Sequence, residues 1–487
     1  MASVKLFLLT LSIFGQSYAD YVAAVVEYQP LFELDLIATV ESNLQQFVNF
    51  IKTAKKGSAQ IIVFPEYGLT GWYPNVTNAA IEIPDPPSTT TNSHSWLQRL
   101  SNAALTHSIY VALNLLEKSY DENNNIVYYN AAIVFDSHGK LVAKYRKINL
   151  FRESYLTPGD FNQNHNVFTT DFGVTFGIFT CFDIVYYDPA IRILNNPSVT
   201  DVIFPTAWLS ILPFFHSLTV QFGYSLANKV NLLAANINNV KYGVGGSGIY
   251  GGNGSVLSYY ISGNAGSKLQ IATVKKVAPA KNTKNINHQL KYFDNKGANL
   301  SNYYSKKYFD FKIYTFKKLN LSQLVIKEDI CYKGFCCTFE IFVSSSGLNS
   351  SEIYQIMAYN GPATIGEPVN IKLCSLVACE TPDLRSCGSR NTNLKTNFTY
   401  ISVEFSVPRD DEGYYLPVSL TKHLAPVLES RFETNINEGN RTSKYYIEKT
   451  IDNIIAFGIA GNGALSVNVN LIMFVSFICL SSWVSFL

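Results

Sequence analysis

The segment that decides the fold is Gly173-Val174-Thr175-Phe176-Gly177-Ile178-Phe179-Thr180-Cys181-Phe182-Asp183-Ile184. Small and β-branched residues alternate with aromatic ones up to Thr180, and the apolar run then meets a polar turn. This pattern is typical of a buried strand that ends at a loop. The ends of such strands hold catalytic side chains rigidly at a cleft, so Cys181 is a candidate nucleophile. A lone cysteine after an apolar strand is also a common core residue, and the rest of the chain has to decide between these readings.

The chain on both sides of this segment alternates predicted strands and helices. Apolar runs and helical spacing predict strands over 21–27, 59–64, 109–116, 202–205 and 230–237, helices over 34–56, 96–106 and 217–229, and a hairpin over 131–144. Such alternation predicts a layered α/β domain from residue 20 to about residue 290.

Residues 1–19 have the features of a secretory signal peptide. Lys5 precedes an apolar run over 6–14, and Ser17-Tyr18-Ala19 places small residues where a signal peptidase cleaves. We therefore expect the mature chain to begin near Asp20, in an oxidising compartment. Asn-x-Ser/Thr sequons agree with this route, and the candidate glycosylation sites are Asn75, Asn253, Asn299, Asn320, Asn349, Asn397 and Asn440.

Residues 458–487 match a signal for a glycosylphosphatidylinositol (GPI) anchor. No charged residue follows Asp452, and small residues and a polar spacer precede a nearly unbroken apolar tail over 471–487. The candidate attachment residues are Asn462 and Gly458. A single-pass membrane helix is the alternative, but cytoplasmic Lys or Arg would normally follow it. We expect a lipid-anchored protein on the outer face of the plasma membrane, with release from the cell as a further outcome.

Composition narrows the class of protein. Hydrophobic residues make up 47% of the 487 residues and aromatic ones 14%, enough for large cores in two or three domains. A net charge of +2 without a cluster of Lys and Arg gives no sign of a nucleic-acid partner.

Motifs for cofactors and other hydrolases have little support. Gly243-x-Gly245-x-x-Gly248 formally matches a dinucleotide fingerprint, but no helical pattern follows it. The histidines lack His-Glu-x-x-His spacing, and no serine stands in a Gly-x-Ser-x-Gly turn. We expect neither a metal nor a cofactor.

The cysteines divide the chain. Six of the eight fall in the second half and can form three disulfides: Cys331, Cys336, Cys337, Cys374, Cys379 and Cys387. The adjacent Cys336 and Cys337 would be strained as a pair, so we expect a distant partner for each. Zinc ligation is the alternative, but paired Cys-x2-Cys units with histidines are missing. Short strand-like runs between turns predict a β-rich, disulfide-stapled second domain over 300–455. Since Cys479 lies in the tail that anchoring removes, Cys181 is the odd thiol of the mature chain, and a reactive role is one explanation.

Two charged residues occupy positions like that of Cys181. Glu66 follows the apolar run Ile61-Ile62-Val63-Phe64, and Lys147 follows another predicted strand. Alone, each would be a solvated charge at a strand end. Together with Cys181 they provide a carboxylate base, a fixed cation and a thiol, which amide hydrolysis needs to move a proton, stabilise an oxyanion and attack carbon.

These segments resemble the nitrilase superfamily, whose Glu-Lys-Cys triad hydrolyses carbon-nitrogen bonds other than peptide bonds. The similarity rests on Phe64-Pro65-Glu66, on Lys144-Tyr145-Arg146-Lys147-Ile148-Asn149-Leu150-Phe151 and on Thr180-Cys181-Phe182-Asp183. Phe204-Pro205-Thr206-Ala207-Trp208 and Gly246-Ser247-Gly248-Ile249-Tyr250 are similar to segments of the biotinidase and vanin branch. The resemblance implies a nitrilase-like α-β-β-α sandwich with Cys181 as nucleophile, Glu66 as general base and Lys147 as stabiliser of the tetrahedral intermediate.

The resemblance also implies a small-molecule amide substrate. Vanins are pantetheinases, which cleave pantetheine to pantothenate and cysteamine, whereas biotinidase cleaves biocytin and other biotinamides. The predicted lipid tail favours the vanin side. A surface protein that uses the fold as a scaffold, without activity, is the remaining alternative. Four further pocket candidates receive no role at this stage: Tyr145, Glu153, Trp208 and His216.

Overall fold

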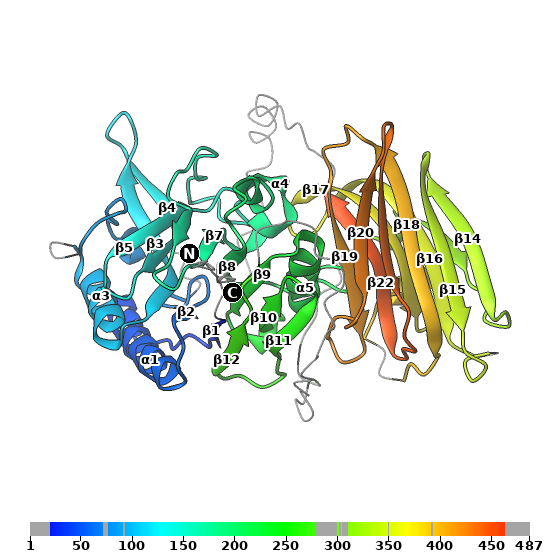
Figure 1. Ribbon diagram of the computed structural model, residues 1–487, viewed down its shortest axis with the longest axis horizontal. Helices are drawn as coiled ribbons and strands as arrows, with labels where there is room; N and C mark the ends of the chain where they lie inside the picture. Colours follow the sequence, from blue (N-terminus) through cyan, green and yellow to red (C-terminus); the bar gives the residue numbers. More distant parts are fainter. Residues whose placement is uncertain are drawn as a thin grey trace, which may run out of the picture. The chain divides into compact units, whose positions relative to one another are not determined.

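The computed structural model of the protein describes residues 20–71, 76–90, 93–277, 300, 303, 310–348, 350–390 and 393–462. The chain forms two compact units (Figure 1). The first consists of Met1–Ile184, Asp188–Ser210 and Tyr224–Ser305, and the second of Val185–Tyr187, Ile211–Gly223 and Lys306–Leu487. The predicted signal peptide and the apolar tail after Asn462 lie outside the described residues.

The first unit contains two six-stranded sheets. One has the order β12-β1-β2-β3-β4-β5 and comprises β1 (Tyr21–Glu27), β2 (Ile61–Val63), β3 (Tyr110–Tyr120), β4 (Ile126–Phe135), β5 (Leu141–Arg146) and β12 (Lys268–Val274). The other has the order β11-β10-β9-β8-β7-β6 and comprises β6 (Val167–Thr169), β7 (Thr175–Ile178), β8 (Asp201–Thr206), β9 (Asn231–Asn236), β10 (Ser247–Gly251) and β11 (Ser255–Tyr260). Strands β1, β2 and β3 are parallel, as are β7, β8 and β9.

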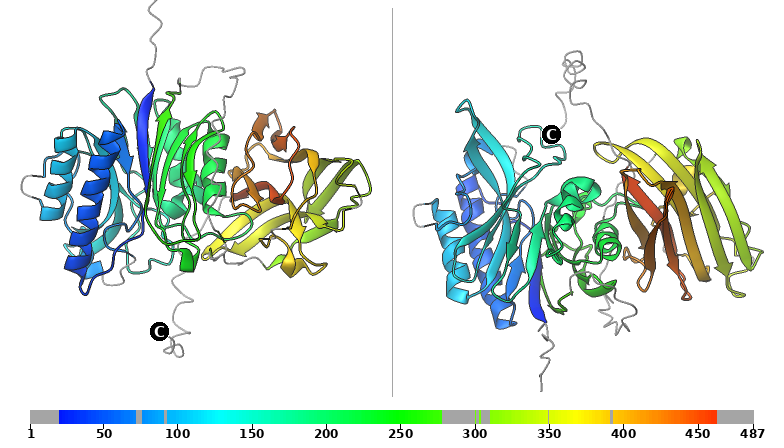
Figure 2. Two further views of the ribbon diagram at one scale, coloured as in Figure 1. Left: turned by 90° about the horizontal axis from the view of Figure 1, so that it is seen from below. Right: turned by 45° about the horizontal axis from the view of Figure 1, so that its top comes forward.

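Helices cover the outer faces of both sheets. Helices α1 (Leu36–Lys56) and α3 (Ser95–His107) lie side by side on the first sheet (Figure 2). On the second sheet, Tyr224 near the end of α5 (Ser217–Asn228) packs against Phe179. The layers therefore confirm the α-β-β-α sandwich that the sequence predicts.

Local sequence signals explain where these elements begin and end. The Asp35 side chain accepts a hydrogen bond of 2.8 Å from the Ala38 N–H and caps α1, which is why the helix starts at Leu36 and not at residue 34. Strand β3 runs four residues beyond its predicted end because it pairs with β4 as far as Tyr120 and Ile126. The dinucleotide-like segment Gly243-x-Gly245-x-x-Gly248 leads into strand β10 (Ser247–Gly251) and not into the helix that a dinucleotide fingerprint requires.

The second unit is built from antiparallel strands. Its two five-stranded sheets have the orders β13-β16-β17-β22-β19 and β14-β15-β18-β21-β20. Their strands are β13 (Thr315–Lys318), β14 (Val325–Tyr332), β15 (Phe335–Val343), β16 (Ile353–Thr364), β17 (Pro368–Cys379), β18 (Phe398–Pro408), β19 (Tyr414–Thr421), β20 (Arg431–Ile436), β21 (Asn440–Ile447) and β22 (Ile454–Asn462). The β-rich second domain is thus confirmed.

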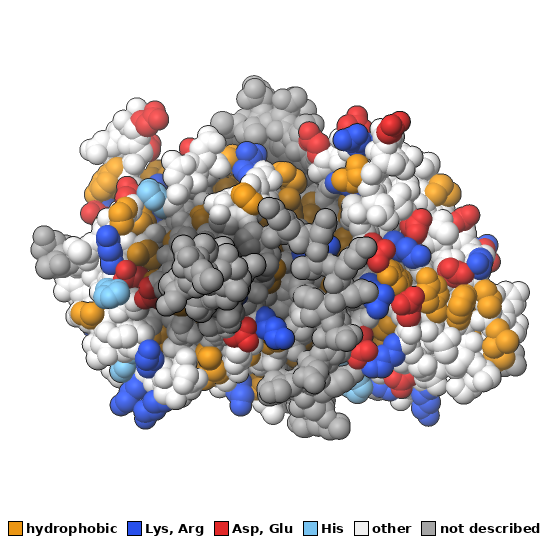
Figure 3. Space-filling model, viewed as in Figure 1, with side chains coloured by type: hydrophobic (Ala, Val, Ile, Leu, Met, Phe, Trp, Pro, Cys, Tyr) orange, Lys and Arg blue, Asp and Glu red, His pale blue; other side chains and the backbone are white. Residues whose placement is uncertain are grey.

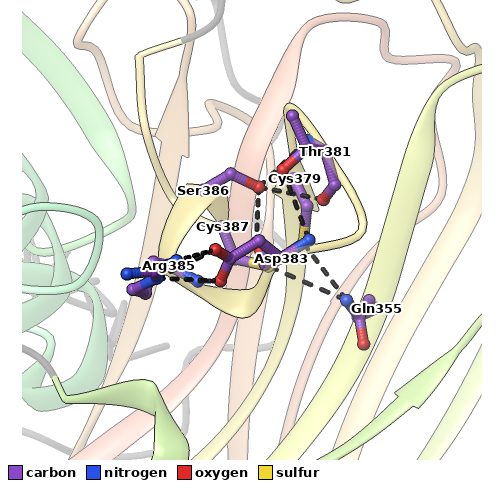
Figure 4. Close-up of a disulfide and its surroundings, with 7 residues drawn as sticks. All are labelled: Gln355, Cys379, Thr381, Asp383, Arg385, Ser386 and Cys387. Carbon is purple, nitrogen blue, oxygen red and sulfur yellow. Dashed lines mark hydrogen bonds and ion pairs between the residues drawn. A yellow bond between two sulfur atoms is a disulfide. The ribbon is translucent and has the colours of Figure 1, made fainter.

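Three disulfides form in the second unit, as the cysteine count predicts: Cys331–Cys336, Cys337–Cys374 and Cys379–Cys387. The expectation of a distant partner was wrong for Cys336, which pairs five residues back. Strands β14 and β15 form a tight hairpin that places Cys331 directly opposite Cys336. Neighbouring side chains on a strand point to opposite faces, so Cys337 reaches the other sheet through Cys374. Figure 4 shows the third disulfide, whose sulfur atoms lie 3.6 and 3.8 Å from the Gln355 side-chain nitrogen.

The exposure of the sequons differs along the chain. Asn253, Asn320 and Asn440 are exposed, and Asn397 is half-buried. The other three predicted sites, Asn75, Asn299 and Asn349, lie outside the described residues.

On the face seen in Figure 3, Lys and Arg side chains lie among Asp and Glu side chains. The described residues include no helix that is long and apolar enough to cross a membrane.

Candidate active site

Three strand ends position the residues that the sequence singles out. Glu66 follows β2 and Lys147 follows β5 directly, both in the first sheet, whereas Cys181 follows β7 in the second. Their exposed fractions are 1%, 2% and 7%. Electrostatic interactions join all three, so the structure brings them together in one buried site of the first unit.

The Lys147 ammonium lies between two carboxylates. Its Nζ donates hydrogen bonds of 2.8 Å to Glu66 Oε1 and 2.7 Å to Glu153 Oε2. An ammonium has three N–H bonds, so one remains for a substrate atom. Burial by itself would lower the pKa of Lys147, but Glu153 and Glu66 reverse this and hold the pKa well above its ordinary value. Lys147 is therefore a cation at neutral pH.

Glu66 accepts hydrogen bonds on both oxygens. In addition to Lys147, the Asn130 side chain donates to Oε1 at 2.7 Å, and the Ala207 N–H donates to Oε2 at 2.8 Å. Ala207 directly follows β8 in the second sheet. The carboxylate therefore bridges the two sheets in a fixed orientation.

A relay of amides fixes the direction of Asn130. The Tyr67 N–H donates to Asn114 Oδ1 at 3.1 Å, so the Asn114 amino group must point away and donates to Asn130 Oδ1 at 2.5 Å. The Asn130 amino group is thereby turned toward the carboxylates, and it donates to Glu66 and, at 2.8 Å, to Glu153. The Tyr67 hydroxyl donates to the same Glu153 oxygen.

Cys181 stands at a strained turn. Its φ is +50°, a conformation that costs a non-glycine residue about 1 kcal/mol or more, and a 3-10 helix, Cys181–Val185, begins there. The Asp183 carboxylate holds the turn by accepting from the Thr180 N–H at 3.1 Å, the Tyr145 hydroxyl at 2.7 Å and the Asn149 N–H at 2.8 Å. Such strain, maintained by surrounding hydrogen bonds, is a common feature of catalytic turns.

The surroundings of the sulfur favour the protonated thiol. Burial is the main cause that raises the pKa of Cys181, and the negative charge of Glu66 raises it further, whereas Lys147 lowers it. Cys181 thus rests as a thiol, and it needs a base in order to react. Among the described residues, no group of three His, Cys, Asp or Glu side chains is placed to hold a metal ion.

Family models cover both units. Residues 22–281 match the model described as carbon-nitrogen hydrolase, and residues 303–464 match the vanin C-terminal domain. The chain belongs to the carbon-nitrogen hydrolase family. The second match, with the relatives below, agrees with the resemblance to the biotinidase and vanin branch.

Curated relatives align with this carbon-nitrogen hydrolase over most of its length. Vanin-like protein 2 of Drosophila melanogaster is 31% identical, covering 91% of this chain and 89% of the relative. Pantetheinase of Bos taurus is 29% identical over 80% of each chain, and biotinidase of Bos taurus is 30% identical over 88% and 89%. Among solved structures, Nit3 of Saccharomyces cerevisiae, a nitrilase superfamily member, has a TM-score of 0.43 and 23% identity, covering 52% of this chain and 89% of its own.

Two residues of this hydrolase's site carry roles that sequence patterns do not assign. Glu153 holds Lys147, and Asn130 donates to Glu153 and orients the carboxylates. The sequence does carry a signal for Asn130. It stands in the middle of strand β4, directly before the apolar run Ala131-Ala132-Ile133, and a polar amide buried there must find hydrogen-bond partners. Of the other candidates, Tyr145 supports Asp183, the Trp208 N–H donates to Asn236, and His216 belongs to the second unit.

Proposed function

We propose that this carbon-nitrogen hydrolase cleaves the linear amide of pantetheine to pantothenate and cysteamine, with Cys181 as nucleophile, Glu66 as general base and Lys147 as oxyanion stabiliser. One observation carries the proposal: the thiol, the carboxylate and the ammonium lie in one buried site of a chain that aligns with pantetheinases over about four-fifths of its length. The family assignment supports an active enzyme, and it gives no support to the alternative of an inactive scaffold protein.

The first half of the reaction forms a thioester. Glu66 removes the thiol proton of Cys181, and the sulfur attacks the amide carbon. The carbonyl oxygen becomes an oxyanion next to the free N–H of Lys147. When the tetrahedral intermediate collapses, the carbon-nitrogen bond breaks and the amine leaves with the proton that Glu66 returns.

The second half consumes water. Glu66 removes a proton from water as its oxygen attacks the thioester carbon, and the carbon-sulfur bond then breaks. The acid leaves and the proton returns from Glu66 to the Cys181 sulfur. No electron transfer is involved, and proton transfer by one positioned group contributes roughly 10²- to 10⁴-fold to the rate.

Hydrolysis of biocytin is the alternative, because biotinidase aligns with this chain as fully as the pantetheinases do. The experiment compares amine release from pantetheine and from biocytin by the purified protein and by Cys181→Ala. The proposal expects pantetheine cleavage that the substitution abolishes. Cleavage of biocytin alone would establish the alternative, and pantetheine cleavage by Cys181→Ala would remove the assigned nucleophile.

The proposal includes secretion, glycosylation and a GPI anchor. Of the two attachment candidates, Asn462 is preferred because attachment there keeps all of β22 as the structure describes it. Gly458 lies inside that strand, between β17 and β19. Attachment at Gly458 would remove part of a central strand. Release by a phosphatidylinositol-specific phospholipase, followed by mass spectrometry of the C-terminal peptide, tests this choice.

A further inference from the structure

Two buried threonines, Thr180 before Cys181 in the chain and Thr206 at the end of β8, have hydroxyl groups that are not satisfied. The side chains of Thr180 and Thr206 are 0% exposed, and neither Oγ1 has a partner at ordinary hydrogen-bond geometry among the described residues. The Cys181 sulfur is near enough to Thr206 for the two side chains to interact. Most buried side-chain hydroxyls in proteins have a partner, so each exception requires an explanation. For Thr206 the explanation lies in its place in the second sheet.

Thr206 ends the strand next to the one that leads to Cys181. Strands β7 and β8 are parallel neighbours in which Ile178 pairs with Ile203. Cys181 lies three residues after the end of β7, and Thr206 is the last residue of β8. Both Thr206 and the Ala207 N–H interact with the Cys181 sulfur. The following residue, Ala207, donates its N–H to Glu66. Thr206 therefore stands where the second sheet meets both the thiol and its base.

We propose that the Thr206 hydroxyl donates a hydrogen bond to the Cys181 thiolate, which makes Thr206 a further catalytic residue. The proposal rests on the role of Cys181 as nucleophile. A hydroxyl that no other acceptor occupies can turn toward the sulfur as negative charge develops there. Hydrogen bonds to a charged atom are the strong ones, and they matter most in a buried site.

The charges around the sulfur explain why such a donor is needed. Burial and Glu66 both oppose a negative sulfur, and Lys147 shares its charge with Glu66 and Glu153. The Thr206 hydroxyl and the Ala207 N–H act in the opposite direction and lower the pKa of the thiol. The hydrogen bond forms when the S–H proton passes to Glu66, and Thr206 keeps its own proton throughout. The same bond stabilises the thiolate when the thioester breaks down.

The test measures the thiolate directly. Thr206→Val keeps the shape of the side chain and removes the donor, whereas Thr206→Ser keeps the donor. Cys181 is the cysteine of the described residues that lies outside a disulfide, so iodoacetamide labelling can be followed on its peptide by mass spectrometry. Thr180→Val is the matched control, because it removes the other buried hydroxyl that lacks a partner.

We expect Thr206→Val to slow alkylation of Cys181 by about tenfold from about pH 7 to about pH 10, since the lost bond is made to a charged atom. Thr206→Ser should restore most of the rate, and Thr180→Val should retain it. Alkylation of Thr206→Val at the wild-type rate would overturn the proposal, as would an equal loss in Thr180→Val. If Thr206→Val does not fold, Thr206→Ala removes the same hydroxyl with less crowding and gives the same decision.

Alkylation does not depend on substrate turnover. If the wild-type protein cleaves neither pantetheine nor biocytin, the proposed function fails, whereas the effect of Thr206 on the thiolate is still measured. Conversely, if Thr206→Val is alkylated at the wild-type rate and the wild type cleaves pantetheine, the proposed role of Thr206 fails and the proposed function stands.

Discussion

Lys147 donates a hydrogen bond of 2.7 Å to the carboxylate of Glu153, which lies six residues later in the chain. The Phe151 N–H donates to the same oxygen at 3.0 Å, so the backbone of the intervening loop holds the carboxylate in place. Lys147 also contacts Glu66, and the ammonium is therefore fixed from two sides. We infer that Glu153 holds the Lys147 ammonium in position, whereas the proposed role of Glu66 is to transfer protons to and from the reacting groups.

Replacing Glu153 by Gln should lower kcat by about 10²-fold and leave KM nearly unchanged, because a positioned charge-assisted donor acts on the transition state. Glu153 is the main group that raises the pKa of Lys147 against the effect of burial. Its removal lowers that pKa, so the alkaline limb of the kcat/KM profile should move to lower pH. Steady-state kinetics across the alkaline range measure both effects.

Glu117→Gln is the matched control. Glu117 is also a buried glutamate, 1% exposed, and contacts Lys144 at 3.0 Å and Arg146 at 2.7 Å on the strand that leads to Lys147. Its loss should lower stability without moving the alkaline limb. Equal movement of the limb in both variants would contradict a specific role for Glu153.

The amide relay predicts an effect from a residue that does not contact the three proposed catalytic residues. Asn114 is 2% exposed and lies behind Asn130. Asn114→Leu removes the acceptor of the Tyr67 N–H and the donor to the Asn130 oxygen, which should cost about 2 to 4 kcal/mol in the free energy of unfolding. The Asn130 amide also loses its fixed orientation, so activity should fall in the protein that remains folded.

Asn130→Asp separates orientation from charge. It places a third carboxylate against Glu66 and Glu153 at positions where a donor stood at 2.7 and 2.8 Å. We expect a larger loss of kcat than in Asn114→Leu, because like charges in a buried site repel strongly. Denaturant titration and kinetics on both variants check the order, and retained activity in Asn130→Asp would contradict the arrangement of the relay.

The parts of the site that sequence reasoning found are those carried by strand ends. Glu66 and Cys181 each follow an apolar run, and Lys147 follows a strand with alternating apolar residues. The layered fold follows for the same reason, since alternating strands and helices leave few arrangements that bury both faces of a sheet. These features depend on residues that are close together in the sequence.

The parts that were missed depend on contacts between distant segments. Asn130 contacts Glu66 from 64 residues away, and no local pattern specifies that pairing. The hairpin that joins Cys331 to Cys336 turns at Lys333 and Gly334, both with positive φ, and sequence distance alone suggested longer links. Thr206 lies in the segment Phe204-Pro205-Thr206-Ala207-Trp208, but its unsatisfied hydroxyl is a property of the packed structure.

Glu27 should make folding sensitive to pH. Burial raises the pKa of its carboxyl to about 7, although Asn238, Ser247 and the Gly246 N–H donate to it. As the pH rises from 4.5, the unfolded chain loses this proton first, and the folded chain keeps it until about pH 7. The stability that Glu27 contributes therefore falls over this range, by about 3 kcal/mol.

Glu27→Gln cannot ionise, so it serves as the reference. The difference in unfolding free energy between wild type and Glu27→Gln, measured by denaturant titration at several pH values, should decline from pH 4.5 to about pH 7. The variant is less stable at low pH because its amide NH₂ group replaces a carboxyl oxygen that accepts hydrogen bonds, so some of the surrounding donors lose their acceptor. A difference that stays constant with pH would show that Glu27 does not titrate in this range.

The disulfides of the second unit should contribute unequally to its stability. Cys337–Cys374 links strands of the two sheets across 37 residues, whereas Cys331–Cys336 closes five residues of a hairpin that the strand ladder already closes. Chain entropy assigns about 4 kcal/mol to the first link and about 2 kcal/mol or less to the second. The double variant Cys337→Ala with Cys374→Ala should therefore unfold at a markedly lower temperature than Cys331→Ala with Cys336→Ala. Calorimetry on the two variants measures their unfolding temperatures. A lower unfolding temperature for the variant without Cys331–Cys336 would contradict the prediction, because that link would then stabilise the unit more than its short loop allows.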